Sequence, residues 1–175
     1  AASLAQRGLR DGHRRVITLY PDTSQGHRIF GEWNQAWTKS GGSVIQSHAF
    51  NPQVSDHSQI LRELFHLEHS VARRTALQDI LGNNVNLKFV ARRRQDIDAV
   101  FILADINQTR LIKPQIDFHH AHDIVVYGLN SNYTGISQPV RDLDLEGIVF
   151  GEMPWIVNQE PSISALRARI SPQDS

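Results

Sequence analysis

The sequence feature that most constrains the fold is a pair of apolar runs joined by a helical pattern, within residues 96–135. Residues 99–104 read AVFILA, a continuous apolar run that is typical of a parallel strand covered on both faces. Residues 124–127 read IVVY, a second β-branched run, and Gly128 stops it. Two buried strands connected through a helix form a βαβ unit, whose crossover is almost always right-handed.

The segment between the two runs has the features of a helix with a polar start. Asp105 and Asn107 provide short side-chain oxygens that can accept the free N–H groups of a first helical turn. One side of the helix then carries Leu111, Ile112, Gln115 and Phe118. Phe101, in the middle of the preceding strand, is expected to be fully buried.

Strand and helix patterns alternate along the rest of the chain. Apolar runs predict strands at about 15–20, 43–49, 98–104, 124–128 and 147–150. Polar Gln46 and Ser47 interrupt the second of these, which favours an outer position in the sheet. The spacing of apolar residues over 29–37 predicts an amphipathic helix, whose Trp33 and Trp37 belong to the core. The alternation predicts an α/β fold, with an open, mostly parallel sheet and helices on both faces.

The segment at about 66–94 is the least regular part of the pattern. It has helical potential over residues 71–81, a stop at Gly82, and then a short apolar patch. We interpret it as a helical insertion in a single α/β lobe formed by residues 1–175. The chain opens with a helix-like segment that leads directly into a strand, and we therefore expect it to be a fragment of a longer protein.

The candidate site lies at one edge of the predicted sheet. All strands of a parallel sheet end at the same edge, and ligands bind there near a switch in strand order. We expect one rim to collect the polar and aromatic residues that follow the strands: Tyr20, Asp22, Ser24, Asp105, Gln108, Tyr133 and Trp155. Their polarity predicts a hydrated groove, with a ligand-binding or lobe-facing role.

Composition and missing motifs argue against several function classes. Lys+Arg and Asp+Glu number 18 each, and the resulting formal net charge of +0 argues against binding to nucleic acid or to an anionic membrane. The sequence has no GxGxxG, GxxxxGK[ST], GxSxG or HExxH motif, so we predict neither catalytic residues nor a cofactor. Cysteine is absent, and no apolar run approaches the roughly 20 residues that cross a bilayer.

Histidine is the enriched functional residue type, with 9 copies. His119, His120 and His122 cluster at the end of one predicted helix, and His66 and His69 are spaced i, i+3 on another. Imidazoles on one helical face can bind a transition metal, but no acidic partner stands at ligand spacing. Histidines near a helix C-terminus also interact favourably with its dipole, and we predict no metal site.

The sequence from residue 92 to residue 155 closely resembles the C-terminal domain of the LppC family of outer-membrane lipoproteins. The matched features include RRQDID at 93–98, Gln108, RLIKP at 110–114, Tyr127, Tyr133, Gly135, Gly147 and MPW at 153–155. Asp11-Gly12-His13 and Gly26 also fit, so the likeness covers most of the chain.

This resemblance implies one lobe of a fold like that of the type I periplasmic binding proteins, which have two α/β lobes. It also implies a non-catalytic regulator, which binds and activates a class A penicillin-binding protein, a peptidoglycan synthase, in the periplasm. From the resemblance we expect the family's helical-repeat domain to lie outside this sequence. We expect the same of the lipid-bearing cysteine, which attaches such proteins to the outer membrane and would be this protein's only link to a membrane.

A second function class stays open beside this one. The chain could be the solute-binding lobe of a periplasmic-binding-protein-like receptor, whose strand-end loops hold a small polar ligand. A small molecule bound between those loops would favour the receptor. A filled cleft with an interaction patch on a convex face would favour the regulator. An α/β enzyme is a more distant alternative.

Overall fold

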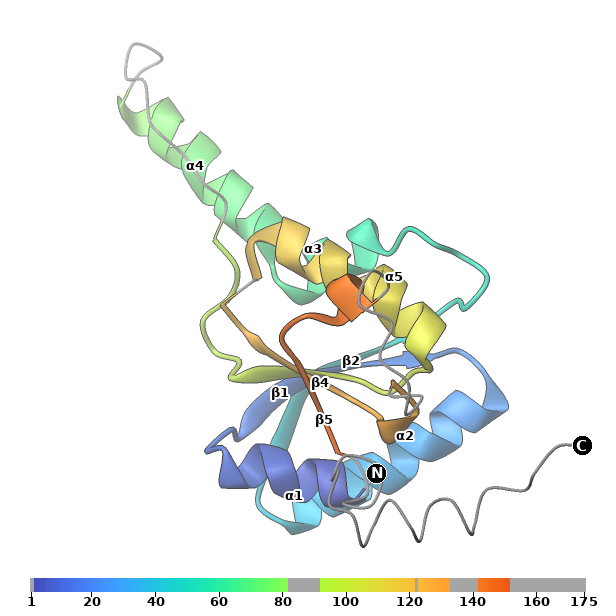
Figure 1. Cartoon of the computed structure of the whole chain (residues 1–175). Helices are drawn as coiled ribbons and strands as arrows, with labels where there is room; N and C mark the ends of the chain where they lie inside the picture. Colours follow the sequence, from blue (N-terminus) through green and yellow to red (C-terminus); the bar gives the residue numbers. More distant parts are fainter. Residues whose placement is uncertain (1, 82–91, 122, 133–141, 152–175) are drawn as a thin grey trace, which may run out of the picture.

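The structure is a computed structural model that describes residues 2–81, 92–121, 123–132 and 142–151. These residues form a five-stranded parallel sheet in the order β2-β1-β3-β4-β5 (Figure 1). The strands are β1 (Arg15–Pro21), β2 (Ser43–Phe50), β3 (Ala99–Ile102), β4 (Val125–Gly128) and β5 (Ile148–Phe150). The sheet confirms the predicted fold class, and β2 has the outer position expected of it.

Helices cover both faces of the sheet, as predicted (Figure 1). One face is covered by α1 (Ala2–Arg10) and α2 (Ser24–Lys39), and the other by α3 (Ser58–Leu64) and α5 (Ile106–Ile116). Helix α5 continues into the π-helical turn η1 (Asp117–Ala121), and the 3-10 turns η2 (Asn130–Asn132) and η3 (Leu143–Leu145) lie between β4 and β5. None of the described helices is long and apolar enough to cross a membrane.

The side chains of β3 alternate between two separate cores. Ala99 and Phe101 belong to the core under α1 and α2, whereas Val100 and Ile102 belong to the core under α3 and α5. All four side chains are 0% exposed. Because both faces of this strand are covered, its sequence is continuously apolar rather than alternating.

Phe101 is the centre of an aromatic cluster that joins the sheet to α2. Its ring centroid lies 4.7 Å from Trp33, 5.2 Å from Trp37 and 4.7 Å from the stacked ring of Tyr127. All four rings are fully buried, which confirms the prediction for Phe101 and for the two tryptophans. The Tyr127 hydroxyl donates a hydrogen bond to Asp11 over 2.6 Å and thereby ties β4 to the end of α1. This hydrogen bond holds the pKa of Asp11 below its usual range.

The buried side of α5 differs from the predicted one. Its buried residues are spaced i, i+3, i+4 and i+7: Thr109, Ile112, Lys113 and Ile116. Leu111 and Phe118 are 45% and 78% exposed, so the prediction that they share the inner side with Ile112 was wrong. After Ile116 the helix widens into η1, which has more residues per turn, and Phe118 turns away from the sheet.

Helix α4 (Leu67–Leu81) projects from the rest of the lobe (Figure 1). Only Leu67 and Ser70, in its first turn, are buried. The helix lies within the segment predicted as an insertion, and it begins four residues before the helical stretch predicted at 71–81. The apolar patch predicted after Gly82 lies outside the described residues.

Arg94 anchors the base of α4 to the sheet. Its guanidinium donates to both carboxylate oxygens of Asp96 over 2.7 Å and to Gln46 of β2 over 3.0 Å. It also donates to His66 Nε2 over 3.1 Å, and its backbone N–H donates to the Phe65 carbonyl over 2.9 Å. The ion pair lowers the pKa of Asp96 to about 2.

His66 marks the break between α3 and α4. Its φ of 54° lies in the left-handed region, which is uncommon for a residue other than glycine. Because Nε2 accepts a hydrogen bond from a guanidinium, the neutral imidazole is the form that fits. Burial, and then the positive charge of Arg94, lower the pKa of His66.

The aromatic cluster gives a stability prediction. We expect Phe101→Ala to lower the free energy of unfolding by about 3–5 kcal/mol, because it leaves a cavity among three buried rings. Phe118→Ala removes the same side chain from an exposed site and should change that free energy by less than about 0.5 kcal/mol. Urea unfolding followed by tryptophan fluorescence measures both. Equal effects from the two substitutions would contradict this packing.

The anchor at His66 predicts a pH dependence. The lowered pKa of His66 means that the unfolded chain binds its proton more readily, so stability should fall as pH drops from about 7.5 to about 5.5. His57, whose pKa burial also lowers, contributes with the same sign. Asp96 contributes nothing in this window, because its carboxyl is ionised in both states well above its ordinary pKa of 3.8.

Urea unfolding at the two pH values measures this dependence, and His66→Asn should make it shallower. Asparagine tolerates the left-handed backbone but does not titrate. His27→Asn, at an exposed histidine of α2, is the matched control. An unchanged slope in His66→Asn would show that this ring does not stay neutral in the folded protein.

Candidate functional site

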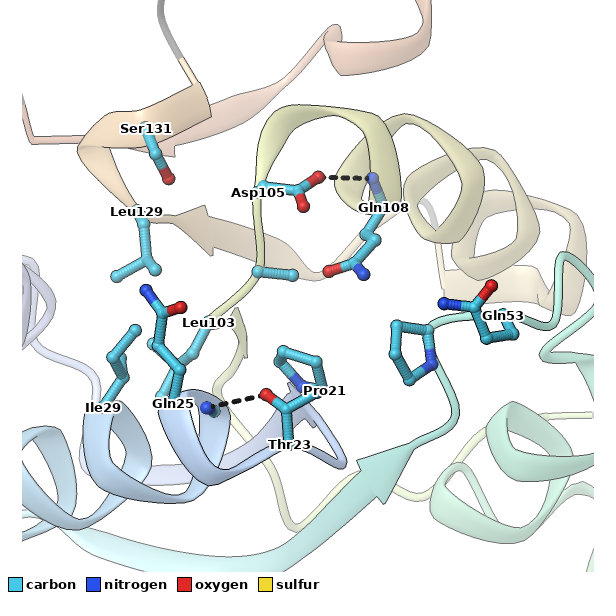
Figure 2. A pocket seen from close by; sticks show the side chains of 13 residues that line it. Pro21, Thr23, Gln25, Ile29, Gln53, Leu103, Asp105, Gln108, Leu129 and Ser131 are labelled. Atoms are coloured by element: carbon cyan, nitrogen blue, oxygen red, sulfur yellow. Dashed lines mark hydrogen bonds between the residues drawn. The ribbon is translucent and has the colours of Figure 1, made fainter.

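The strand order creates a crevice at the carboxyl edge of the sheet. From β1 the chain passes to β2 on one side and later returns to β3 on the other, so β1 and β3 flank a topological switch point. The helices that follow these two strands, α2 and α5, lie on opposite faces and leave an opening between their first turns. A cavity of about 410 Å³ occupies this opening (Figure 2).

The loop after β1 is shaped by a helix cap and a close backbone approach. Thr23 is the N-cap of α2, and its hydroxyl accepts from the Gly26 N–H over 3.0 Å. A Cβ atom on Gly26 would lie 2.0 Å from the Pro21 carbonyl oxygen, so only glycine fits there. Helix α2 begins at Ser24, five residues before the helical stretch predicted over 29–37.

The loop after β3 is shaped by the predicted cap of α5. Asp105 Oδ1 accepts from the N–H groups of Asn107 and Gln108 over 2.9 and 3.0 Å. The Leu103 N–H donates to the Leu19 carbonyl over 2.8 Å, which holds the ends of β3 and β1 together. Asp105 is thus fixed at the mouth of the cavity, with its second carboxylate oxygen outside these cap bonds.

The cavity has an apolar floor and a polar rim. The floor and sides are apolar: Pro21, Ile29, Pro52, Leu103, Ala104 and Leu129. The rim is polar: Thr23, Gln25, Gln53, Asp105, Gln108 and Ser131. In Figure 2 the side chains of Gln25 on α2 and Gln108 on α5 point into the space between the two helices.

Of the predicted site residues, Asp105 and Gln108 line this cavity. Tyr20 does not, because its ring is captured by α2, stacked 4.3 Å from Phe30, and is 8% exposed. Asp22 and Ser24 lie on the exposed side of the same turn, where Asp22 pairs with His27 Nε2 over 2.7 Å. Tyr133 and Trp155 lie outside the described residues.

Four rim residues were not predicted: Thr23, Gln25, Gln53 and Ser131. Thr23 could have been found, because threonine before an amphipathic helix is an N-cap signal. Gln53 could also have been found, since the loop after β2 ends at the same edge as the loops after β1 and β3. Gln25 and Ser131 carry no such sequence signal.

The electrostatics of the rim come from one charged side chain. Asp105 is the only ionisable group among the described lining residues. The described part of the chain also contains no group of three histidine, aspartate or glutamate side chains that could hold a metal ion. Carboxamides, hydroxyls and a carboxylate over an apolar floor can bind another molecule or another protein surface by hydrogen bonds.

The close approach at Gly26 gives a matched pair of substitutions. We expect Gly26→Ala to destabilise the fold by about 1–3 kcal/mol, because the β1–α2 turn must shift. Gly31→Ala, in the same helix with nothing within 4 Å, should stabilise it by about 0.5–1 kcal/mol. Urea unfolding compares the two variants. Stabilisation by both would mean that the Pro21 carbonyl does not lie against α2.

Solved structures with the same fold include the C-domain of an LpoA protein and a solute-binding protein of an ABC transporter. The C-domain of LpoA from Haemophilus influenzae, described as a regulator of PBP1A, matches 96% of this chain and 44% of its own, at 14% identity and a TM-score of 0.61. A solute-binding protein of an ABC transporter from R. palustris, in complex with 4-hydroxybenzoate, matches 80% of this chain and 31% of its own, at 12% identity and a TM-score of 0.54. Both confirm the periplasmic-binding-protein-like fold.

Sequence comparison gives the family. The penicillin-binding protein activator LpoA of Photobacterium profundum is 28% identical over 176 residues, which cover 100% of this chain. The chain spans 28% of the length of that relative. The model of the LppC lipoprotein family matches residues 1–175. The chain therefore belongs to the LppC family of lipoproteins.

Proposed function

We propose that this chain is one lobe of a non-catalytic periplasmic regulator, which binds and activates a class A penicillin-binding protein in peptidoglycan synthesis. The observation that carries the proposal is the match of the LppC family over residues 1–175. A relative named as a penicillin-binding protein activator, aligned over 100% of the chain, supports it. Since the chain spans 28% of that relative, the activity is proposed for the longer protein to which the lobe belongs.

The groups at the candidate site suit a binding role. The described rim offers side-chain amides, hydroxyls and one carboxylate, which hold a partner by hydrogen bonds. Relatives named as an activator and a regulator fit the same role. The proposal therefore assigns no catalytic residue and no cofactor to this chain.

We place the synthase contact away from the carboxyl edge of the sheet. In a two-lobed fold this edge faces the second lobe, and a polar rim suits a hydrated contact that opens and closes. We propose this lobe-closing or ligand-binding role for Asp105 and Gln108, which line the cavity, and for four further residues predicted from the sequence: Asp22, Ser24, Tyr133 and Trp155. The buried ring of Tyr20 has no such role.

The proposal also covers the position of the lobe in the longer protein. Residues 1–175 form a single lobe with a helical insertion at about 66–94, and the lipid anchor that attaches the protein to the outer membrane lies elsewhere in the longer chain. Helix α4, the described helix of the insertion, projects from the lobe, and none of its residues lines the cavity.

A pull-down tests the partner. The full-length protein is immobilised and offered a purified class A penicillin-binding protein, and the experiment is repeated with residues 1–175 alone. We expect both to retain the synthase. Retention by neither would contradict the proposal, and retention by the full-length protein alone would move the contact to another domain.

The same assay tests the assignment of the rim. We expect the full-length protein with Tyr133→Ala and Trp155→Ala to retain the synthase and to stimulate glycan polymerisation as the unchanged protein does. Circular dichroism confirms that the variant is folded. Loss of stimulation in a folded variant would show that the rim itself is the contact surface.

A further inference from the structure

The cavity between α2 and α5 is lined by three side-chain amides that can form hydrogen bonds to a ligand. The side chains of Gln25 and Gln53 are exposed and that of Gln108 is half-buried, and each amide offers two N–H donors and one carbonyl acceptor to the cavity. The three amides come from three different segments, after β1, β2 and β3, and line one space (Figure 2). A volume of about 410 Å³ is within the range of small-molecule sites.

The chemistry of these groups restricts what the cavity can hold. A carboxamide donates and accepts at once, and so do the amide and hydroxyl groups of a ligand. Leu103, Ala104 and Leu129 form an apolar floor, which suits methyl and C–H groups. The complementary ligand is therefore small and polar, with hydrogen-bonding groups on one side and aliphatic groups on the other.

The charge of the rim restricts the ligand further. Asp105 brings a negative charge, and no lysine or arginine is present among the described residues that line the cavity. The cap bonds of Asp105 also satisfy two N–H groups at the start of α5, and Thr23 satisfies one at the start of α2. An anion would thus meet a carboxylate at a site where the helix N-termini are already capped.

We propose that this cavity binds a small neutral ligand through its amide and hydroxyl groups, and that Asp105 excludes carboxylates. The R. palustris protein with the same fold was solved with 4-hydroxybenzoate, an aromatic carboxylate, and benzoate therefore serves as the anionic probe below. The inference extends the proposed function, because it gives the ligand class of the rim that we assign to lobe closure.

Isotope-edited NMR of the 175-residue chain tests the proposal with three probes. N-acetylglucosamine carries one amide and several hydroxyls, N-acetyl-alaninamide carries amides alone, and benzoate is the anionic probe at matched ionic strength. We expect one or both neutral probes to shift the side-chain amide resonances of Gln25 and Gln108. The comparison between them identifies a sugar-like or a peptide-like ligand. Benzoate should shift neither resonance.

Two substitutions separate hydrogen bonding from charge. Gln108→Leu removes one amide at similar volume and should weaken binding of the neutral probe by about 2–12-fold, as expected for one hydrogen bond. Gln59→Leu, at an exposed position of α3 outside the cavity, is the matched control. Asp105→Asn keeps the helix cap, since asparagine caps as well as aspartate. It should raise the affinity for benzoate relative to the affinity for the neutral probe.

The NMR experiment can contradict the ligand inference without contradicting the proposed synthase binding, which the pull-down tests. If neither neutral probe shifts the cavity resonances, or if benzoate binds the unchanged chain as well as they do, the inference is wrong. If Asp105→Asn does not improve benzoate binding, charge exclusion by Asp105 is wrong. A chain that retains the synthase but binds no neutral probe keeps the proposed function and loses only this inference.

Discussion

The packing of Phe101 against three other rings is the interaction on which this lobe depends. Phe101 lies on β3 in the middle of the sheet, Trp33 and Trp37 come from α2, and Tyr127 comes from β4. One side chain therefore sets the distance of a helix from the sheet and the position of the neighbouring strand. Through the hydroxyl of Tyr127, the same cluster also fixes the end of α1. An error in this packing would displace α2, one of the two helices that frame the cavity.

The cavity follows from that framework with few further interactions. The two aligned strand ends hold the start of α2 and the start of α5 apart, and the caps Thr23 and Asp105 fix their first turns. The site is assembled from loops that are distant in sequence and adjacent at a switch point of the sheet. Such a site can change its ligand by substitution in the loops, while the cores beneath stay the same. This explains how one fold serves both transport receptors and the regulators of the LppC family.

Much of the fold could be predicted because burial on both faces leaves a clear sequence pattern. The run at 99–104 and the tryptophans of α2 were placed correctly, since a covered strand and an amphipathic helix need those residues. The side of α5 was placed only in part. Ile112 faces the core together with Thr109, Lys113 and Ile116, which leaves its neighbour Leu111 exposed. The π-helical turn after Ile116 changes the helical period locally and accounts for Phe118 alone. Asp105 was correctly predicted to lie at the strand-end site, where it caps α5. Tyr20 was predicted there too, but its ring packs against Phe30 and does not line the cavity. The synthase as partner came from resemblance, because no local pattern encodes a protein surface.

Helix α4 has a mechanical consequence. With 15 residues at about 1.5 Å each, it is roughly 22 Å long, and within the described residues only its first turn is buried. The backbone changes direction at the left-handed residue His66, directly before the helix begins, and this is the point about which the helix would rotate. A rotation of about 10° at His66 would move the C-terminal end of α4 by roughly 4 Å, because the helix is about 22 Å long. Force applied to that end would reach the sheet through Arg94, which is hydrogen-bonded both to the Phe65 carbonyl and to Gln46 of β2.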